Sequence, residues 1–524
     1  MKQLYFLLWL VTIPVALQSQ QFGVRVNTED AFNGYMLVES FPSNFLIDNC
    51  GEIINEWENV SGTDNHVKLL PNGNILYIRN NTITEKNWNG QTVREWVNTR
   101  QDLQLDYEII SMDSGNWLAI VRKSFSQQEF IDAGYNIGNI GIPTQVDGII
   151  EVDPTSGEIV WEWYIIDHAV QERSPSLNNY GIVENNPQLL NMDAISTFDW
   201  NFRESFMING FDYNPTLDQI VLSVRKMSEI VVIDHSTTTD EAAGHEGGNA
   251  GKGGDILYRW GNPQNYGQGT ADDRYLFFQH NPNWITTGEH EGKIICYNNG
   301  LGRSETDINK GYSQVPIIDT PVTSDGTYNL SPGEAYAPSE PDKAYGKNDS
   351  DTEFYSGYTS GAEMMENGNV YITEGFTGRL FEVSTDGEIV WEYILINSNY
   401  IFRSEKYAPD YIGFTGKDLT PTGNTIEEQG GITNCNIISS VEETFVSRDM
   451  FKISHIDRVN SIQHKEGKTF QLTIYDMLGQ QIYLSTSYSD YHKVDLGNAL
   501  QGIYIMRVDM EDSPHQASFK FSSF

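Results

Sequence analysis

The chain has 524 residues, of which 33 are lysine or arginine and 72 are aspartate or glutamate, so its formal net charge is −39. This acidic excess argues against nucleic acid as a partner, because binding to a phosphate backbone requires a basic surface. Hydrophobic residues make up 39% of the chain and aromatic residues 12%, which is enough for a large core and excludes global disorder.

The N-terminus predicts a signal peptide over residues 1–20. Lys2 precedes an apolar run at residues 4–17, and small or polar residues follow it. A membrane anchor is the alternative, but the run is shorter than the roughly 20 apolar residues that span a bilayer. We therefore expect no stable transmembrane segment and a protein that is exported through the periplasm and is secreted or held at the cell surface.

Two short phrases recur between residues 40 and 400 and indicate repeated hairpins. The first phrase is a turn followed by a strand ending in Trp or Tyr, at residues 51–57, 157–163 and 387–393. The second phrase is an Asn-Gly or Ser-Gly turn followed by an apolar strand, at residues 70–78, 113–120 and 365–372. Both are typical of antiparallel hairpins.

These repeats predict an all-β fold, a six-bladed β-propeller over residues 21–430. One hairpin cannot bury its apolar face, whereas four-stranded sheets repeated around an axis bury it sheet against sheet. At about 40–45 residues per blade, residues 40–400 could hold six blades with insertions. A β-sandwich array and a β-helix are the alternatives, and neither explains the doubled turn-and-strand signature as well.

A second domain is expected after a polar linker at residues 431–448. Residues 470–476 and 502–508 alternate cleanly between apolar and polar side chains. Such short alternating strands predict a small immunoglobulin-like β-sandwich over residues 449–524.

The chain has three cysteines, Cys50, Cys296 and Cys435, and an odd number cannot be fully paired within one chain. No C-x-x-C motif is present, so zinc and thioredoxin chemistry are not expected. Free buried cysteines are the preferred interpretation, although a secreted protein permits one disulfide.

Several phrases resemble those of the arylsulfotransferase family. They occupy residues 161–163, 167–171, 232–239, 254–263, 278–285 and 297–300. The resemblance covers about residues 45–400 and implies a six-bladed β-propeller. It also implies transfer of a sulfuryl group from a small aryl sulfate to a phenol through a sulfated histidine, with no nucleotide donor and no cofactor.

The C-terminal domain resembles the sorting domain of the type IX secretion system, on residues 474–480, 494–496 and 500–504. This resemblance implies the type IX secretion machinery as a partner. An ordinary adhesion-type sandwich is the alternative.

The implied reaction needs a nucleophile, donors that hold the sulfonate oxygens and an acid for the leaving phenolate. The predicted catalytic residues are His280, Arg303 and His168. In the family, the position of His280 belongs to the active site, and Arg303 resembles the arginine that holds sulfate. His168 follows Asp167, a carboxylate that would raise the histidine pKa. A buried structural histidine is the alternative for His280 and His168.

The predicted substrate-binding residues are Arg259, His235, Arg379 and Tyr355. His235 begins a threonine-rich loop and would equally suit a turn stabilised by side-chain to backbone hydrogen bonds. Arg259 and Arg379 would alternatively form ion pairs between blades. We expect His168, His280, Arg259 and Arg303 to converge on one point if the chain is an enzyme.

No metal site is predicted. The run Asn348-Asp349-Ser350-Asp351 could hold calcium in a secreted protein, but it lacks the twelve-residue loop with its final Glu and is expected to be a solvated loop. His245 is expected in a glycine-rich loop, His290 in a solvated turn, and His66 in an exposed or structural position.

The chain departs from the family where further histidines would be expected. Met207 and Arg225 stand at two such positions, and Tyr355, Tyr358, Thr359 and Ser360 occupy the region of a third. Methionine cannot take up a proton and binds a sulfonate oxygen poorly. A catalytically inactive propeller that binds a ligand or glycan at its rim is therefore the alternative function.

Overall fold

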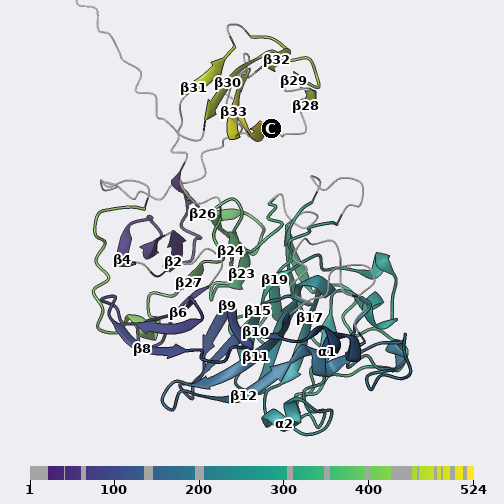
Figure 1. Cartoon of the computed structure of the whole chain (residues 1–524). Coiled ribbons are helices and arrows are strands. Elements are labelled where there is room, and N and C mark those ends of the chain that lie inside the picture. Colours follow the sequence, from purple (N-terminus) through teal and green to yellow (C-terminus); the bar gives the residue numbers. More distant parts are fainter. Residues whose placement is uncertain are drawn as a thin grey trace, which may run out of the picture. The chain divides into compact units, whose positions relative to one another are not determined.

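The computed structural model divides the chain into two compact units, residues 1–438 and 439–524 (Figure 1). It describes residues 22–40, 42–58, 60, 66–134, 145–194, 206–303, 311–346, 354–395, 400–426, 451–456, 459–476, 481–485, 488–495, 502–510 and 516–523. The expected signal peptide and linker lie outside these residues. The described part of the chain is all-β, with only short helical turns.

Among its described residues, the first unit contains six antiparallel sheets of four or five strands each. Sheet 1 contains β27 (Glu405–Tyr407), β2 (Tyr35–Ser40), β3 (Ser43–Asp48) and β4 (Ile53–Trp57). Sheet 2 contains β5 (Val67–Leu69), β6 (Ile75–Arg79), β7 (Thr82–Lys86) and β8 (Thr92–Val97). Sheet 3 contains β9 (Leu103–Ser111), β10 (Trp117–Ser124), β11 (Gln145–Asp153) and β12 (Glu158–Tyr164).

The other three sheets follow in chain order. Sheet 4 contains β15 (Ile208–Asn214), β16 (Gln219–Val224), β17 (Glu229–Asp234) and β18 (Tyr258–Trp260). Sheet 5 contains β19 (His280–Trp284), β20 (Ile294–Tyr297), β21 (Gln314–Ile318) and β22 (Lys343–Gly346). Sheet 6 contains β23 (Gly361–Met364), β24 (Val370–Glu374), β25 (Arg379–Val383), β26 (Ile389–Ile394) and β1 (Gly23–Asn27).

Short elements connect the sheets. A two-stranded parallel sheet pairs β13 (Ala169–Val170) with β14 (Leu190–Asn191). The α-helices are α1 (Gln127–Asp132) and α2 (Thr239–Ala242). The 3-10 turns are η1 (Ile165–His168), η2 (Val183–Asn185), η3 (Arg225–Met227), η4 (Pro263–Tyr266), η5 (Ala271–Asp273) and η7 (Ile412–Phe414).

One hydrogen bond is repeated between every sheet and the next. A side chain on the fourth strand donates to a backbone carbonyl in the loop before the fourth strand of the following sheet. The pairs are Trp57 with Asn87 (3.1 Å), Trp96 with Gly157 (2.9 Å), Trp163 with Gly254 (2.9 Å), Trp260 with Pro338 (2.6 Å), Lys343 with Thr385 (2.7 Å) and Trp391 with Asn49 (2.8 Å). The sixth bond returns to sheet 1, so the six sheets form a closed ring.

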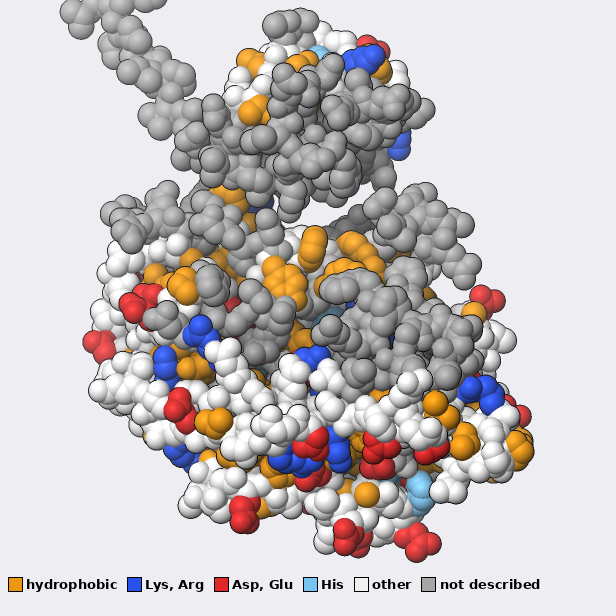
Figure 2. Space-filling view, viewed as in Figure 1, with side chains coloured by type: hydrophobic (Ala, Val, Ile, Leu, Met, Phe, Trp, Pro, Cys, Tyr) orange, Lys and Arg blue, Asp and Glu red, His pale blue; other side chains and the backbone are white. Residues whose placement is uncertain are grey.

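Both ends of the first unit take part in this closure. The N-terminal strand β1 pairs with β26 and extends sheet 6, while β27, from the far end of the unit, pairs with β2 and begins sheet 1. Apolar side chains fill the space between neighbouring sheets. In one such cluster, Ile149 and Trp163 of sheet 3 pack with Phe211 and Leu222 of sheet 4. Figure 2 shows acidic side chains distributed over the visible face, with lysine and arginine between them.

The second unit contains two antiparallel sheets. One sheet is formed by β28 (Phe451–Ile456), β29 (Val459–His464) and β32 (Tyr491–Asp495), and the other by β31 (Gln481–Leu484), β30 (Phe470–Asp476), β33 (Gly502–Met510) and β34 (Gln516–Ser523). The sheets meet at the rings of His492 and Phe470, whose centroids lie 4.8 Å apart. This unit thus has a small buried core of its own.

The cysteines differ from the preferred sequence interpretation. Cys50, beside the carbonyl of Asn49 that Trp391 binds, is disulfide-bonded, so the expectation of a free thiol was wrong there. Cys296 is free and buried, as expected. Within the described residues, no helix has the length and apolar character needed to cross a membrane.

The ring closure leads to a first prediction. The change Trp391→Phe removes the indole N–H that reaches Asn49 and leaves that carbonyl without this donor. The matched control is Trp117→Phe, because Trp117 is equally buried and its indole N–H has no partner among the described residues. We expect Trp391→Phe to lower the free energy of unfolding by about 1–2 kcal/mol more than the control, measured by urea denaturation. Equal losses would mean that the bond contributes nothing to closure.

Candidate functional site

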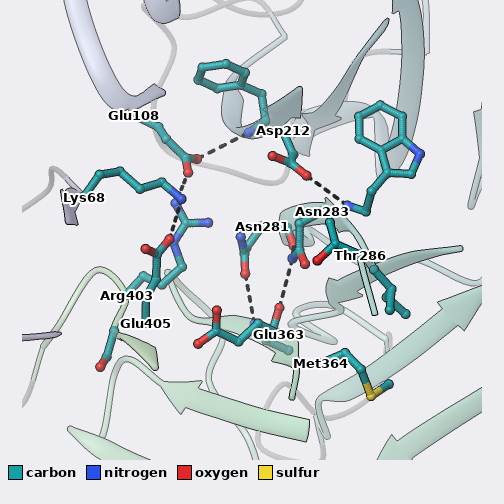
Figure 3. A pocket seen from close by; sticks show the side chains of 15 residues that line it. Lys68, Glu108, Asp212, Asn281, Asn283, Thr286, Glu363, Met364, Arg403 and Glu405 are labelled. Carbon is teal, nitrogen blue, oxygen red and sulfur yellow. Dashed lines mark hydrogen bonds and ion pairs between the residues drawn. The ribbon is translucent and has the colours of Figure 1, made fainter. Parts of the chain in front are cut away.

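A central cavity lies where the first strands of the six sheets meet (Figure 3). Its volume is about 200 Å³, and every first strand contributes at least one residue to its wall. The contributions include Lys68 of β5, Glu108 of β9, Asp212 of β15, Asn283 of β19, Glu363 of β23 and Glu405 of β27. Sequence positions as far apart as 337 residues therefore line the same cavity.

Acidic side chains dominate this cavity, and only part of their charge is compensated. Arg403 forms an ion pair with Glu108, and Lys68 forms one with Glu405. Asp212 accepts a hydrogen bond from the backbone N–H of Trp284 at 2.9 Å. An anionic substrate is thus not favoured inside the cavity itself.

Two cavity carboxyl groups have pKa values shifted in opposite directions. Burial, together with the nearby charge of Glu405, raises the pKa of Glu363 to about 8. Burial also opposes ionisation of Glu405, but Lys68 and His66 outweigh it and hold the Glu405 pKa well below its usual range. Paired groups with separated pKa values are typical of acid–base sites, and Glu363 is the member that carries a proton at neutral pH.

His66 belongs to the wall behind this cavity, which the sequence did not indicate. It is 1% exposed, and its Nε2 lies 2.9 Å from Oε1 of Glu405. Burial and the charge of Arg403 lower its pKa to about 4. Its position directly before β5 is the only signal that could have identified it.

His280 is held in one orientation at the start of β19. Asn299 donates from Nδ2 to the carbonyls of Ser356 (2.8 Å) and Thr359 (2.9 Å). Its Oδ1 must therefore accept the hydrogen bond from Nδ1 of His280, at 2.7 Å. This network fixes the proton on Nδ1 and leaves the lone pair on Nε2.

The imidazole of His280 is also kept neutral. Burial, followed by the positive charge of nearby Arg225, lowers its pKa to about 3. A neutral imidazole with a lone pair on a fixed nitrogen is the form that acts as a nucleophile or base. The arrangement around His280 therefore suits chemistry at Nε2.

Strained backbone surrounds the same region. Five non-glycine residues at the starts of β15, β19 and β23 have positive φ angles: Met207 (61°), Phe278 (56°), Asn281 (49°), Thr359 (51°) and Ser360 (86°). Such conformations cost about 1–3 kcal/mol each and gather at functional sites. Here they precede or begin three of the six first strands.

Two arginines that pack on Phe277, three positions before His280, lack a carboxylate partner among the described residues. The guanidinium carbons of Arg274 and Arg303 lie 4.2 Å and 4.9 Å from the ring centre of Phe277. Arg303 donates to the hydroxyl of Tyr312 at 3.2 Å, while its buried Nε and Nη2 find no acceptor in the described residues. Buried guanidinium N–H groups without acceptors are typical of a site that binds an anion.

The charges of this pair are not neutralised internally. Burial lowers the pKa of Arg303, and burial together with the charge of Arg303 lowers that of Arg274 to about 10. Both side chains remain charged at neutral pH. In a chain of net charge −39, this is a local positive site.

Arg225 connects the pair to His280. Its guanidinium lies 4.9 Å from the ring of Phe278 and 5.4 Å from that of Tyr358, and it donates to the sulfur of Met207 at 3.5 Å. Because Tyr358 is 37% exposed, the group reaches the surface. We refer to His280, Arg225, Arg274 and Arg303, with Phe277 and Phe278, as the His–Arg cluster.

The structure does not bring the seven predicted site residues to one point. His280 and Arg303 belong to the His–Arg cluster, and Tyr355 lies close to it, through its neighbour Tyr358. Arg259 lies on the fourth strand of sheet 4, is fully buried, and forms a two-pronged ion pair with Glu229 at 2.9 and 2.5 Å. The expected convergence of His168, His280, Arg259 and Arg303 is thus not observed.

Three further predicted residues have partners away from the cluster. Arg379 pairs with Glu392 at 2.6 Å and with Glu374 at 3.4 Å. His168 lies at the end of η1 and contacts Asp255 at 2.8 Å. His235 lies between Asp218 at 2.7 Å and Glu151 at 3.2 Å. His168 thus has the buried position given as its alternative. The partners of Arg379 lie in its own sheet rather than in a neighbouring one, and His235 contacts carboxylates rather than the backbone.

The comparisons with known proteins give two family matches. Residues 4–400 match the family described as Arylsulfotransferase (ASST), and residues 449–520 match the secretion system C-terminal sorting domain. No curated protein matches the chain.

Similar solved structures are distant. A protein of unknown function from Bacteroides caccae is 11% identical, with 72% of this chain and 99% of that chain covered and a TM-score of 0.40. Virginiamycin B lyase from Staphylococcus aureus is 10% identical, with 76% and 90% covered and a TM-score of 0.28. The β-propeller domain of Cps50 (Swd1) from Myceliophteria thermophila is 11% identical, with 71% and 96% covered and a TM-score of 0.31.

The two carboxylates around His235 lead to a prediction on stability. Burial opposes its charge, but the hydrogen bonds and negative charges of Asp218 and Glu151 raise the His235 pKa to about 9. An unfolded histidine titrates near pH 6.5, so the folded state keeps a proton that the unfolded state loses. This stabilisation is complete below about pH 6.5 and disappears as the pH rises through about 9.

We expect the free energy of unfolding to decrease between about pH 6 and pH 10 in both the unmodified protein and the His235→Gln variant. The decrease should be about 2–3 kcal/mol larger in the unmodified protein. Urea denaturation across this range measures the difference. His290→Gln, which changes a histidine in an outer turn, should retain the full pH dependence. Parallel curves for the unmodified protein and His235→Gln would contradict the assignment.

Proposed function

Because the chain belongs to the arylsulfotransferase family, we propose that its first unit is a six-bladed β-propeller that transfers a sulfuryl group from an aryl sulfate to a phenolic acceptor through His280. The C-terminal sorting domain indicates export by type IX secretion to the cell surface or the exterior, and we propose an immunoglobulin-like sandwich for it. The observation that carries the proposed activity is a neutral His280, with its lone pair fixed on Nε2, in one cluster with Arg303, whose Nε and Nη2 find no acceptor in the described residues.

The proposed reaction has two steps at His280. Nε2 attacks the sulfur of the aryl sulfate, so that an N–S bond forms while the bond between sulfur and the aryl oxygen breaks and the phenolate leaves. The oxygen of the acceptor phenol then attacks the same sulfur, the N–S bond breaks, and the electron pair returns to Nε2. The phenolate gains a proton in the first step, and the acceptor loses one in the second.

The sulfonate oxygens are assigned to the arginines of the His–Arg cluster. A guanidinium presents parallel N–H donors that match two oxygens of an anionic group, and such donors stabilise charge that develops in a transition state. The central cavity is less suited to this role because carboxylates line it. We therefore place the sulfonate between His280 and Arg303, at the end where the first strands begin.

The cavity supplies a candidate for the acid. Glu363 carries a proton at neutral pH because its pKa is raised to about 8. It follows Ala362, whose backbone N–H donates to Asn281, the residue after His280. A carboxylic acid in this position suits the transfer of a proton to and from the phenol oxygen.

A propeller that binds a ligand without catalysis is the second candidate. Met207 stands where many relatives carry a histidine, and here its sulfur accepts a hydrogen bond from Arg225. That contact occupies an arginine which would otherwise be directed at a substrate. The exposed ring of Tyr358 next to Arg225 would suit stacking against a sugar or an aromatic ligand.

The nucleophile is tested with the exported protein, an aryl sulfate and a phenol. We expect sulfate transfer and acid-labile sulfate on His280, and we expect His280→Ala to lower the transfer rate by more than about 10³-fold, since it removes the nucleophile. His290→Ala is the control and should retain full activity. If the unmodified protein shows neither transfer nor sulfated histidine, the enzymatic proposal is excluded and the binding alternative remains.

The role of Arg303 is tested separately. Loss of one donor to a developing charge costs on the order of 10²–10³ in rate, so Arg303→Gln should lower kcat/KM for the aryl sulfate by that factor. The control is Arg173→Gln, because Arg173 is an exposed arginine paired with Asp193. If the two variants have equal kcat/KM values, Arg303 does not bind the sulfonate.

A further inference from the structure

We propose that His168, His245 and Asp255 form a site for one divalent transition-metal ion, with zinc as the best fit. The three residues lie outside the His–Arg cluster and the central cavity. They join η1, which follows sheet 3, to the glycine-rich loop between β17 and β18 of sheet 4.

The ligand atoms already converge on one oxygen. Nδ1 of His168 lies 2.8 Å and Nδ1 of His245 lies 2.7 Å from Oδ1 of Asp255. All three ligand atoms lie within 4.8 Å of one another. Zinc binds histidine nitrogen and carboxylate oxygen at about 2.0–2.2 Å, which places tetrahedral ligands roughly 3.3 Å apart. An ion therefore needs each nitrogen to move about 0.5 Å farther from the carboxylate oxygen. The two nitrogens, which lie within 4.8 Å of each other, must approach by up to about 1.5 Å.

The surroundings of His168 favour a metal on Nδ1. Its Nε2 lies 2.8 Å from the carbonyl oxygen of Ala242, an atom that can only accept a hydrogen bond. Nε2 therefore carries a proton, and a ring without a second proton presents the lone pair of Nδ1 to the carboxylate of Asp255. A cation placed between Nδ1 of His168 and the carboxylate of Asp255 would bind both atoms and remove the unfavourable contact between two acceptors. A backbone carbonyl that orients the far nitrogen is the usual arrangement around a metal-binding histidine.

The ring of His168 is fixed by packing as well. It stacks on Trp163 with centroids 5.5 Å apart and an interplanar angle of 4°. Gly254 permits this approach, since a Cβ there would lie 2.6 Å from Nε2 of His168. One ligand of the site is thus in place before any ion binds.

The other side of the site is open and adaptable. The side chain of His245 is 60% exposed. It can therefore shift until its Nδ1 is at coordination distance from an ion that His168 and Asp255 also bind. Zinc is commonly bound by three protein ligands, and a water molecule then occupies the exposed fourth coordination position. Nitrogen and carboxylate ligands without sulfur suit zinc and neighbouring divalent metals better than copper(I).

The site coincides with one of the bonds that close the ring of sheets. Trp163, on which His168 stacks, donates its indole N–H to the carbonyl of Gly254, one residue before Asp255. Helix α2, just before His245, contacts β12, which carries Trp163 (Figure 1). An ion bound here would fasten the loop at residues 242–254 to sheet 3.

No metal site was expected from the sequence, and His168 was assigned to catalysis. The reason is spacing, since 87 positions separate His168 from Asp255 and no short motif contains the three ligands. The proposal rests on the geometry alone and is independent of the proposed transferase activity.

The test is a zinc titration of the full-length exported protein, purified without a polyhistidine tag and stripped with a chelator. We expect one equivalent of zinc to bind in isothermal titration calorimetry and to raise the melting temperature. His245→Ala should weaken binding at least tenfold, and its exposed position allows the variant to fold, which circular dichroism verifies. His290→Ala is the matched control, because His290 also faces a single carboxylate, Asp342, at 3.4 Å.

X-ray absorption of the zinc-loaded protein gives a second measurement that needs no variant. The expected first shell has two histidine nitrogens, light oxygen ligands and no sulfur. The inference is overturned if the stripped protein binds no zinc, if His245→Ala binds zinc as tightly as the unmodified protein, or if the absorption spectrum lacks two histidine ligands.

Discussion

The closed ring of six sheets is the constraint on which the rest of the structure depends. Each sheet is fastened to the next by a side-chain donor on its fourth strand, and the bond from Trp391 to Asn49 joins the last sheet to the first. Only closure of the ring allows β27 and β5 to line the same cavity as β15 and β19, which lie on its other side. The position of His280, and of every residue that faces it across the axis, therefore follows from bonds made at the outer edge of the ring.

Charge is distributed unevenly within this frame. Carboxylates line the central cavity, and two of its cations are already paired with them. The guanidinium groups of Arg274 and Arg303, by contrast, pack against Phe277 and have no carboxylate partner among the described residues. In a protein of net charge −39, these arginines can attract an anion, and Arg225, which packs with Arg274 on Phe278, connects them to the histidine whose lone pair is fixed.

The sequence predicted the architecture better than the site. The first repeated phrase contains Trp57, Trp163 and Trp391, which make three of the six bonds that close the ring. The other three donors, Trp96, Trp260 and Lys343, lie outside the phrases that the sequence repeats. The site was only partly accessible. His280 and Arg303 were found through resemblance, whereas Arg259 and His235 are typical motif residues whose partners, Glu229 and Asp218, are revealed only by tertiary contacts. Arg274 and His66 carry no local motif, and their roles depend on which strands meet in the ring.

The most direct test of the account is a crystal structure of the exported protein after brief exposure to an aryl sulfate. The account predicts a sulfuryl group bonded to Nε2 of His280, with its oxygens facing the guanidinium groups of the His–Arg cluster. Clear density for an intact aryl sulfate elsewhere on the protein, with His280 unmodified and its Nε2 directed away from the bound molecule, would contradict it.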